Sequence, residues 1–174
     1  MNEIKEIAQL GAAVLRQNAE PVCDVNGADT RALIAAMKAS LAGTQGVGLA
    51  APQIDASRRL VIVASRPTPR YPNAPLMEPT VMINPSFRAL SDAKEKGWEG
   101  CLSIPGIRAL VPRYTDIRIA YTDENGAPVE RVLHDFIARV FQHEVDHLDG
   151  LVFLDRVESN RDIFSESEYL KLFS

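Results

Sequence analysis

The sequence contains few cysteines, histidines and aromatic residues. Its 174 residues include two cysteines, and phenylalanine, tryptophan and tyrosine together make up 6% of the chain. Two cysteines are too few for a disulfide scaffold, so we expect free thiols and a cytoplasmic location. The chain has three histidines, His134, His143 and His147. Any chemistry that depends on imidazole must therefore use this small set.

Long apolar runs and an excess of positive charge are also missing. No stretch reaches the roughly 18 apolar residues that mark a membrane-spanning helix, and charges interrupt the N-terminal segment as they would not in a signal peptide. The 19 basic residues are outnumbered by 23 acidic ones, which gives a net charge of −4. We therefore expect neither a membrane nor a nucleic acid as partner.

The length and the apolar fraction of 46% fit one domain spanning residues 1–174. Asp29 or Thr30 can cap a helix that carries apolar residues at helical spacing. Residues 60–64 and 81–83 are branched and apolar, which predicts buried strands. Between them, residues 66–79 contain five prolines, which predicts a surface loop because proline cannot donate a hydrogen bond to a sheet.

The second half of the chain alternates between strand and helix patterns. Residues 116–122 and 129–133 flank a turn and predict a β-hairpin. Residues 135–148 predict a helix that Gly150 closes, followed by a short strand at 151–154 and a small helix after Ser165. This mixed order predicts an α+β fold, with small mixed or antiparallel sheets packed around the helix at 135–148.

The segment from Gln142 to His147 reads Q-H-E-V-D-H. Residues four apart lie on the same face of a helix, so His143 and His147 can bind one metal ion. Glu144 then lies close enough to reach a water molecule at the ion without being a ligand. The alternative is a solvated helix that happens to carry two histidines, but the neighbouring turns of this helix are apolar.

A hydrolytic metal site usually has a third protein ligand, and the best candidate is Cys101 in Glu99-Gly100-Cys101-Leu102-Ser103. A thiolate binds zinc or ferrous iron well. Taken alone, Cys101 is better explained as a buried structural cysteine, and only its neighbours favour a metal ligand. Downstream acidic residues at other spacings offer no comparable ligand.

Three blocks together resemble the signature motifs of the peptide deformylase family, in the same order along the chain. They are Gly46-Val47-Gly48-Leu49-Ala50-Ala51-Pro52-Gln53, Glu99-Gly100-Cys101-Leu102-Ser103 and Gln142-His143-Glu144-Val145-Asp146-His147. The resemblance implies an enzyme that removes the formyl group from the N-terminal formyl-methionine of newly made proteins and releases formate. Its substrates would be formyl-methionyl peptides or nascent chains, with a transient contact to the ribosome.

The resemblance also implies a role for each matching residue. Cys101, His143 and His147 would be the ligands of one divalent metal ion, usually ferrous iron, with zinc, nickel or cobalt as substitutes. Glu144 would carry the proton. The remaining roles fall on an oxyanion pair (Gln53 and the backbone N–H of Leu102), on substrate-binding residues (Val47, Gly48, Gly100 and Arg108), and on supporting carboxylates (Glu99 and Asp146).

The side chain of the substrate methionine needs an apolar pocket. Phe136 and Val140 lie on the same helix face as His143 and are the candidates, although plain core positions would give the same pattern. Arg139 stands near this pocket where the family often has an apolar residue. Substrate preference therefore stays open.

Three other functions remain possible from sequence alone. One is a zincin-type peptidase, which shares the H-E-x-x-H pattern but not the cysteine block. Another is a metal-binding or ribosome-associated protein without catalysis, which would require neither Glu144 nor Gln53. The third is a related enzyme acting as a broader N-deacylase, which would share the metal site.

Overall fold

The computed structural model describes residues 4–68 and 71–173. Its strands are β1 (Gly48–Ala50), β2 (Leu60–Ser65), β3 (Met77–Ala89), β4 (Lys94–Cys101), β5 (Ile104–Tyr114), β6 (Asp116–Thr122), β7 (Pro128–His134) and β8 (Ile163–Ser165). Its α-helices are α1 (Ala28–Ala42), α2 (Asp135–Leu148) and α3 (Glu166–Lys171). Short 3-10 helices span Ala13–Arg16, Ala51–Ile54, Phe153–Arg156 and Asn160–Asp162.

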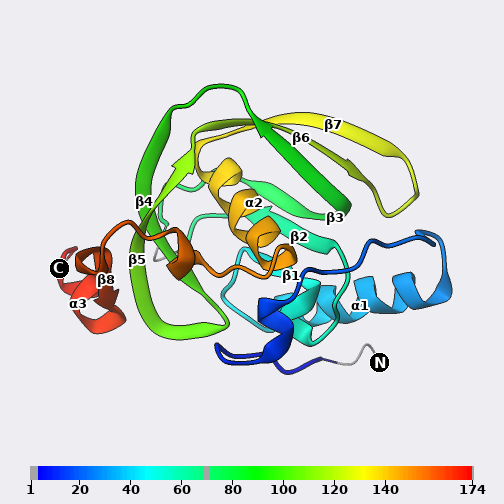
Figure 1. Cartoon of the computed structure of the whole chain (residues 1–174), viewed down its shortest axis with the longest axis horizontal. Helices are drawn as coiled ribbons and strands as arrows, with labels where there is room; N and C mark the ends of the chain where they lie inside the picture. Colours follow the sequence, from blue (N-terminus) through cyan, green and yellow to red (C-terminus); the bar gives the residue numbers. More distant parts are fainter. Residues whose placement is uncertain (1–3, 69–70, 174) are drawn as a thin grey trace.

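The strands form two antiparallel sheets with α2 lying against both (Figure 1). The five-stranded sheet has the order β1-β2-β3-β6-β7, and the three-stranded sheet has the order β4-β5-β8. Every pairing between the described strands is antiparallel. This arrangement confirms the predicted α+β class with antiparallel sheets.

The helix α2 lies in the middle of the molecule because most of its side chains are buried. Every residue from Val140 to Leu148 is buried. Phe141, Val145 and Leu148 pack into one apolar cluster with residues of β2 and β6. The run also contains five buried polar residues, and burying them requires compensating partners; they are Gln142, His143, Glu144, Asp146 and His147.

Several predicted elements have the predicted positions. The helix at 135–148 is confirmed residue for residue, and Gly150 follows it with a φ of +71°, a conformation that favours glycine. The hairpin is confirmed as β6 and β7 with Asp116 opposite His134. The terminal helix begins after Ser165, whose hydroxyl accepts a hydrogen bond from the backbone N–H of Glu168.

Other predictions about secondary structure were wrong. The cap of α1 is Gly27, not Asp29 or Thr30, because the helix begins one residue before Asp29. Residues 151–154 are not a strand, since Phe153 begins a 3-10 helix. The proline-rich loop ends at residue 76, and Pro79 lies inside β3. Its part at residues 69 and 70 lies outside the described residues.

Strand β3 tolerates its prolines at points where its pairing is irregular. The pairing of β3 with β2 shifts between Val63 and Ser65, whose partners in β3 flank Pro79. The pairing of β3 with β6 shifts at Pro85. A proline at such a bulge interrupts no regular ladder hydrogen bond. Among the described residues, no helix is both long and apolar enough to cross a membrane.

Candidate metal and active site

The structure brings Cys101 together with His143 and His147. Cys101 is the last residue of β4, where the chain turns towards β5, and both histidines lie on one face of α2. One ligand atom from each of the three side chains lies within 4.8 Å of the other two. The Sγ of Cys101 is 3.4 Å from the Nε2 of His147. Residues that are 42 positions apart in the sequence, Cys101 and His143, thus share one site.

A buried carboxylate sets the orientation of the His143 ring. The Nδ1–H of His143 donates a hydrogen bond of 2.9 Å to Oε2 of Glu99, which leaves Nε2 as the atom that can bind a metal. Metal-binding histidines usually have such a carboxylate behind them. The prediction that Glu99 supports a ligand therefore agrees with the contact seen here.

The residues present fit a divalent transition metal. A thiolate and two imidazoles are the donors that zinc and ferrous iron prefer. Oε2 of Glu144, next to this cluster, is buried and has no hydrogen-bond partner among the described residues. A buried polar atom without a partner is costly, so the atom is best explained by a small ligand that it would contact.

Burial and neighbouring charges shift the protonation of three groups at this cluster. For His143, burial lowers the pKa, but Cys101 and Glu99 outweigh it and raise the pKa well above its usual value while no metal is bound. Burial lowers the pKa of His147 well below its usual value, and the positive charges of His143 and Arg113 lower it further. His147 is therefore neutral, as a metal ligand must be. Burial also raises the pKa of Glu144 to about 7, because water no longer stabilises the carboxylate.

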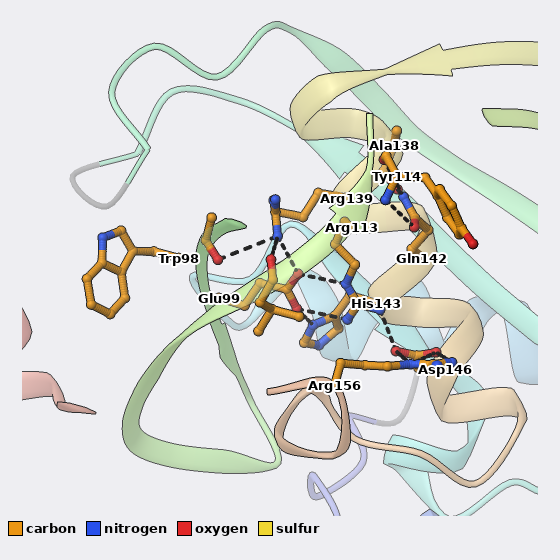
Figure 2. Close-up of polar contacts among 12 residues, drawn as sticks. Trp98, Glu99, Arg113, Tyr114, Ala138, Arg139, Gln142, His143, Asp146 and Arg156 are labelled. Atoms are coloured by element: carbon orange, nitrogen blue, oxygen red, sulfur yellow. Dashed lines mark hydrogen bonds and ion pairs between the residues drawn. The ribbon is translucent and has the colours of Figure 1, made fainter. Parts of the chain in front are cut away.

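Glu99 belongs to a network of charges that ties β4 to β5 and α2 (Figure 2). Its two oxygens accept hydrogen bonds of 2.9 and 3.0 Å from Arg113. Arg113 also donates to Asp146, which accepts a further bond from Arg156. Burial alone would raise the pKa of Glu99, but Arg113 and His143 outweigh it and hold the pKa below its usual range. Asp146 thus acts on Arg113, not on a ligand directly.

The predicted oxyanion donor Gln53 lies beside the cluster. Its side-chain N–H groups point to the Sγ of Cys101 at 3.5 Å and the Oγ of Ser103 at 3.2 Å. Its Oε1 accepts a hydrogen bond from the backbone N–H of Ala50, which fixes the side chain. Leu102 directly follows Cys101, so its backbone N–H belongs to the turn that begins at the cysteine of the cluster.

A cavity of about 470 Å³ opens onto the cluster. Residues predicted for substrate binding that line it are Val47, Gly48, Gly100, Arg108, Phe136 and Val140. Gln53, Cys101, Leu102, His143 and Glu144 line it as well. The structure therefore gathers the predicted residues around one cavity, with His147 buried behind them.

Comparison with known proteins decides the family. The family model described as polypeptide deformylase matches residues 4–162. The chain belongs to this family. It is 53% identical over 170 residues to peptide deformylase 2 of Nostoc sp., an alignment that covers 98% of this chain and 95% of the relative. It is 44% identical over 155 residues to peptide deformylase 2 of Ralstonia nicotianae, covering 89% and 88%.

A solved deformylase structure has the same fold. The class I type b peptide deformylase of Acinetobacter baumannii with bound Met-Ala-Ser has a TM-score of 0.87 and 42% identity to this chain. The match covers 90% of this chain and 100% of that one. Membership of the deformylase family confirms the resemblance drawn from the three sequence blocks and the prediction of an enzyme.

Within this deformylase framework, Arg139 has a clearer place than the sequence suggested. Its guanidinium donates to Oε1 of Glu99 and to the backbone oxygens of Glu95, Gly97 and Val111. A Cβ at Gly97 would lie 2.7 Å from its Cζ, so the missing side chain makes room for the guanidinium. Arg139 lines the cavity but is fastened to β4 and β5, which leaves it little freedom to meet a substrate.

Tyr71 and Glu166 are two of the cavity-wall residues that sequence reasoning missed. Tyr71, from the proline-rich loop, packs on Phe136 with ring centroids 4.7 Å apart and donates a hydrogen bond to the backbone oxygen of Trp98. Glu166, at the start of α3, pairs with Arg108. Neither residue belongs to a motif, and both reach the site through contacts distant in sequence. No local pattern could have indicated them.

Proposed function

We propose that this chain hydrolyses the N-terminal formyl group of formyl-methionyl peptides and nascent chains in the cytoplasm, and that residues 1–174 form one catalytic domain. The observation that carries the proposal is the carboxylate of Glu144, buried without a partner for Oε2 beside a Cys-His-His cluster. A site that only binds metal has no need for this costly group. The family and the Met-Ala-Ser complex of its Acinetobacter baumannii relative support a peptide substrate.

The metal ligands would be Cys101, His143 and His147, in the H-E-x-x-H pattern of α2 and the turn after β4. Ferrous iron is the proposed ion, with zinc, nickel or cobalt as substitutes. A bound cation of this kind polarises a carbonyl and makes water acidic enough to attack at neutral pH. The hydrogen bond to Glu99 would keep His143 in the tautomer whose Nε2 is available to such an ion.

Glu144 would accept a proton from the attacking water and deliver it to the departing amine. Its pKa of about 7 in the metal-free site means that both protonation states are accessible near neutral pH. A neighbouring cation lowers that pKa and favours the basic form at the start of the reaction. Because Glu144 is buried, bulk water has little access to the proton on its carboxylate.

Developing negative charge on the formyl oxygen requires fixed donors. The amide of Gln53 and the backbone N–H of Leu102 would supply them. The hydrogen bond from Ala50 holds Gln53 in place before substrate arrives, so little reorganisation accompanies the reaction. The formyl carbon carries only a hydrogen. A wall formed by Gly48, Gln53 and Leu102 would clash with the methyl of an acetyl group at the same position.

The substrate would bind as an added strand beside β1. Strand β1 is at the edge of its sheet and pairs on one side with β2, and Gly48 at its start lines the cavity. Val47 and Gly48 would pair with the peptide backbone, as in other cases of strand addition. The methionine side chain would enter the pocket of Phe136 and Val140, a burial worth about 2 kcal/mol.

The test is formate release from formyl-Met peptides by protein loaded with ferrous iron without oxygen. Wild type should cleave formyl-Met far faster than acetyl-Met, whereas Glu144→Ala should keep its metal and lose at least roughly 100-fold in kcat. Equal rates on both peptides would identify a broader N-deacylase. Cleavage of internal peptide bonds instead would identify a zincin-type peptidase.

A further inference from the structure

Arg108 has an unusual environment for a residue on a cavity wall. It lies in β5 and is 5% exposed, and its Nη2 donates a hydrogen bond of 2.7 Å to Oε1 of Glu166. The Nε of Arg108 is buried without a hydrogen-bond partner among the described residues. A guanidinium in this position is a buried cation whose charge is balanced by the ion pair with Glu166.

Gly100 creates the space for this guanidinium. A Cβ at Gly100 would lie 1.2 Å from Nη1 of Arg108 and 2.4 Å from its Cζ. Gly100 directly precedes the proposed ligand Cys101, and neighbouring Cα atoms are about 3.8 Å apart. The guanidinium is therefore within about two residues of an extended peptide from the metal site, at about 3.3 Å per residue.

The C-terminal segment holds Glu166 in place. Strand β8 pairs with β5 so that Phe164 lies opposite Arg108. The ring of Trp98 contacts Phe164 and Tyr169 with centroids 5.0 and 4.9 Å apart. Glu166 lies between these two anchored residues in the sequence, so its carboxylate is presented to the cavity from a packed support.

The exposed member of the pair is the acid. The side chain of Glu166 is 31% exposed, against 6% for Arg108. Both residues line the cavity. A peptide leaving the metal site thus meets the more exposed carboxylate of this ion pair first, with the guanidinium of Arg108 beneath it.

From this arrangement we propose that Glu166 determines the charge preference of the enzyme for the residues that follow methionine. The inference rests on the proposed deformylase function and adds a specificity residue outside its three motifs. Glu166 favours basic side chains and disfavours acidic ones at the third residue of the substrate. Without its carboxylate, the charge of Arg108 is unbalanced and attracts acidic side chains instead.

The experiment compares kcat/KM for formyl-Met-Ala-Lys-amide and formyl-Met-Ala-Asp-amide at low ionic strength. The ratio of the two should fall by roughly tenfold in Glu166→Gln, mainly through KM, and the difference should shrink at high salt. Glu168→Gln is the matched control, because Glu168 lies on the same helix and pairs with Lys171. An unchanged ratio in Glu166→Gln, or the same change in Glu168→Gln, overturns the proposal.

Two further measurements distinguish a failure of this proposal from a failure of the proposed deformylase function. Glu166→Asp keeps the charge and should keep the preference for lysine, so a reversal there would point to lost packing and refute a role of charge. Dissociation constants of Met-Ala-Lys-amide and Met-Ala-Asp-amide test the preference without catalysis. If wild type cleaves no formyl peptide, the proposed function fails, and the ratio of these constants in wild type and Glu166→Gln still decides the role of Glu166.

Discussion

Replacing Gly48 by alanine should displace the carboxylate of Glu144. A Cβ at position 48 would lie 2.3 Å from Oε1, 2.7 Å from Cδ and 2.9 Å from Cγ of Glu144. Real Cβ atoms do not approach heavy atoms so closely, so one side must move. Gly48 lies in β1 and pairs regularly with Val63 of β2, which resists movement of the backbone. The end of the Glu144 side chain is the part that yields.

The loss of activity should be much larger than the loss of stability. A misplaced proton carrier costs about 100-fold to 10,000-fold in rate, equivalent to about 3–5 kcal/mol in the activation barrier. Overpacking a buried site costs about 1–3 kcal/mol of folding free energy. Because a flexible side chain absorbs the clash, Gly48→Ala should fall at the lower end of that range.

The assay pairs formate release with metal content and thermal unfolding. Gly48→Ala should bind metal as wild type does and unfold a few degrees lower, with kcat reduced nearly as far as in Glu144→Ala. Gly43→Ala is the matched control, because a Cβ there would lie no closer than 3.5 Å to another atom. Full activity in Gly48→Ala would refute the reasoning, and parallel loss of metal would show that the ligands, not Glu144, had moved.

Further predictions concern the metal. Cys101→Ala, His143→Ala and His147→Ala should each lose metal and activity together, and X-ray absorption of the iron-loaded protein should show one metal–sulfur bond, whose absence would rule out Cys101. Glu99→Gln should weaken metal affinity by roughly 10-fold to 100-fold in chelator competition, because the acceptor behind His143 loses its charge; equal affinity would deny that Glu99 orients the ring. If the ion is ferrous iron, air should inactivate the enzyme by oxidising the iron or Cys101, and nickel-loaded protein should survive; equal lifetimes in air and argon would contradict iron.

The sequence patterns that depend on neighbouring residues predicted structure well. The helix α2 and the β6–β7 hairpin follow from apolar periodicity and a turn, which are local properties. The two histidines of the cluster were predictable for the same reason: they lie one helical turn apart, and the spacing itself indicates a shared face. Cys101 required its flanking block, since a lone cysteine carries no comparable signal.

Strands β4 and β5 could not be predicted from local patterns. Strand β4 reads Lys-Glu-Lys-Gly-Trp-Glu-Gly-Cys, a charged sequence with two glycines and no apolar alternation. Its glycines, Gly97 and Gly100, are explained by arginines that come from α2 and β5. Such a strand is stabilised by contacts with α2 and β5, which lie elsewhere in the sequence, so its own residues do not indicate a strand.

The walls of the cavity lie beyond local patterns in the same way. Tyr71 comes from the proline-rich loop, and Glu166 from the small helix after Ser165. Each is positioned by a contact with Trp98 or its backbone, or by pairing with β5. The motifs indicated the proposed reacting groups, whereas Tyr71 and Glu166 could be placed at the cavity only from the tertiary structure.

The buried charges of Glu99, Arg113 and Asp146 restrict how this enzyme can change over evolutionary time. Removing one member of such a network leaves an uncompensated charge in the interior, at a cost of roughly 3–5 kcal/mol. That is a large part of the stability of an ordinary domain. Replacing the whole network by apolar residues could be neutral for folding, but the route passes through single changes that are not. The carboxylate behind His143 is thus kept in place by its neighbours, even against mutations that would leave every metal ligand intact.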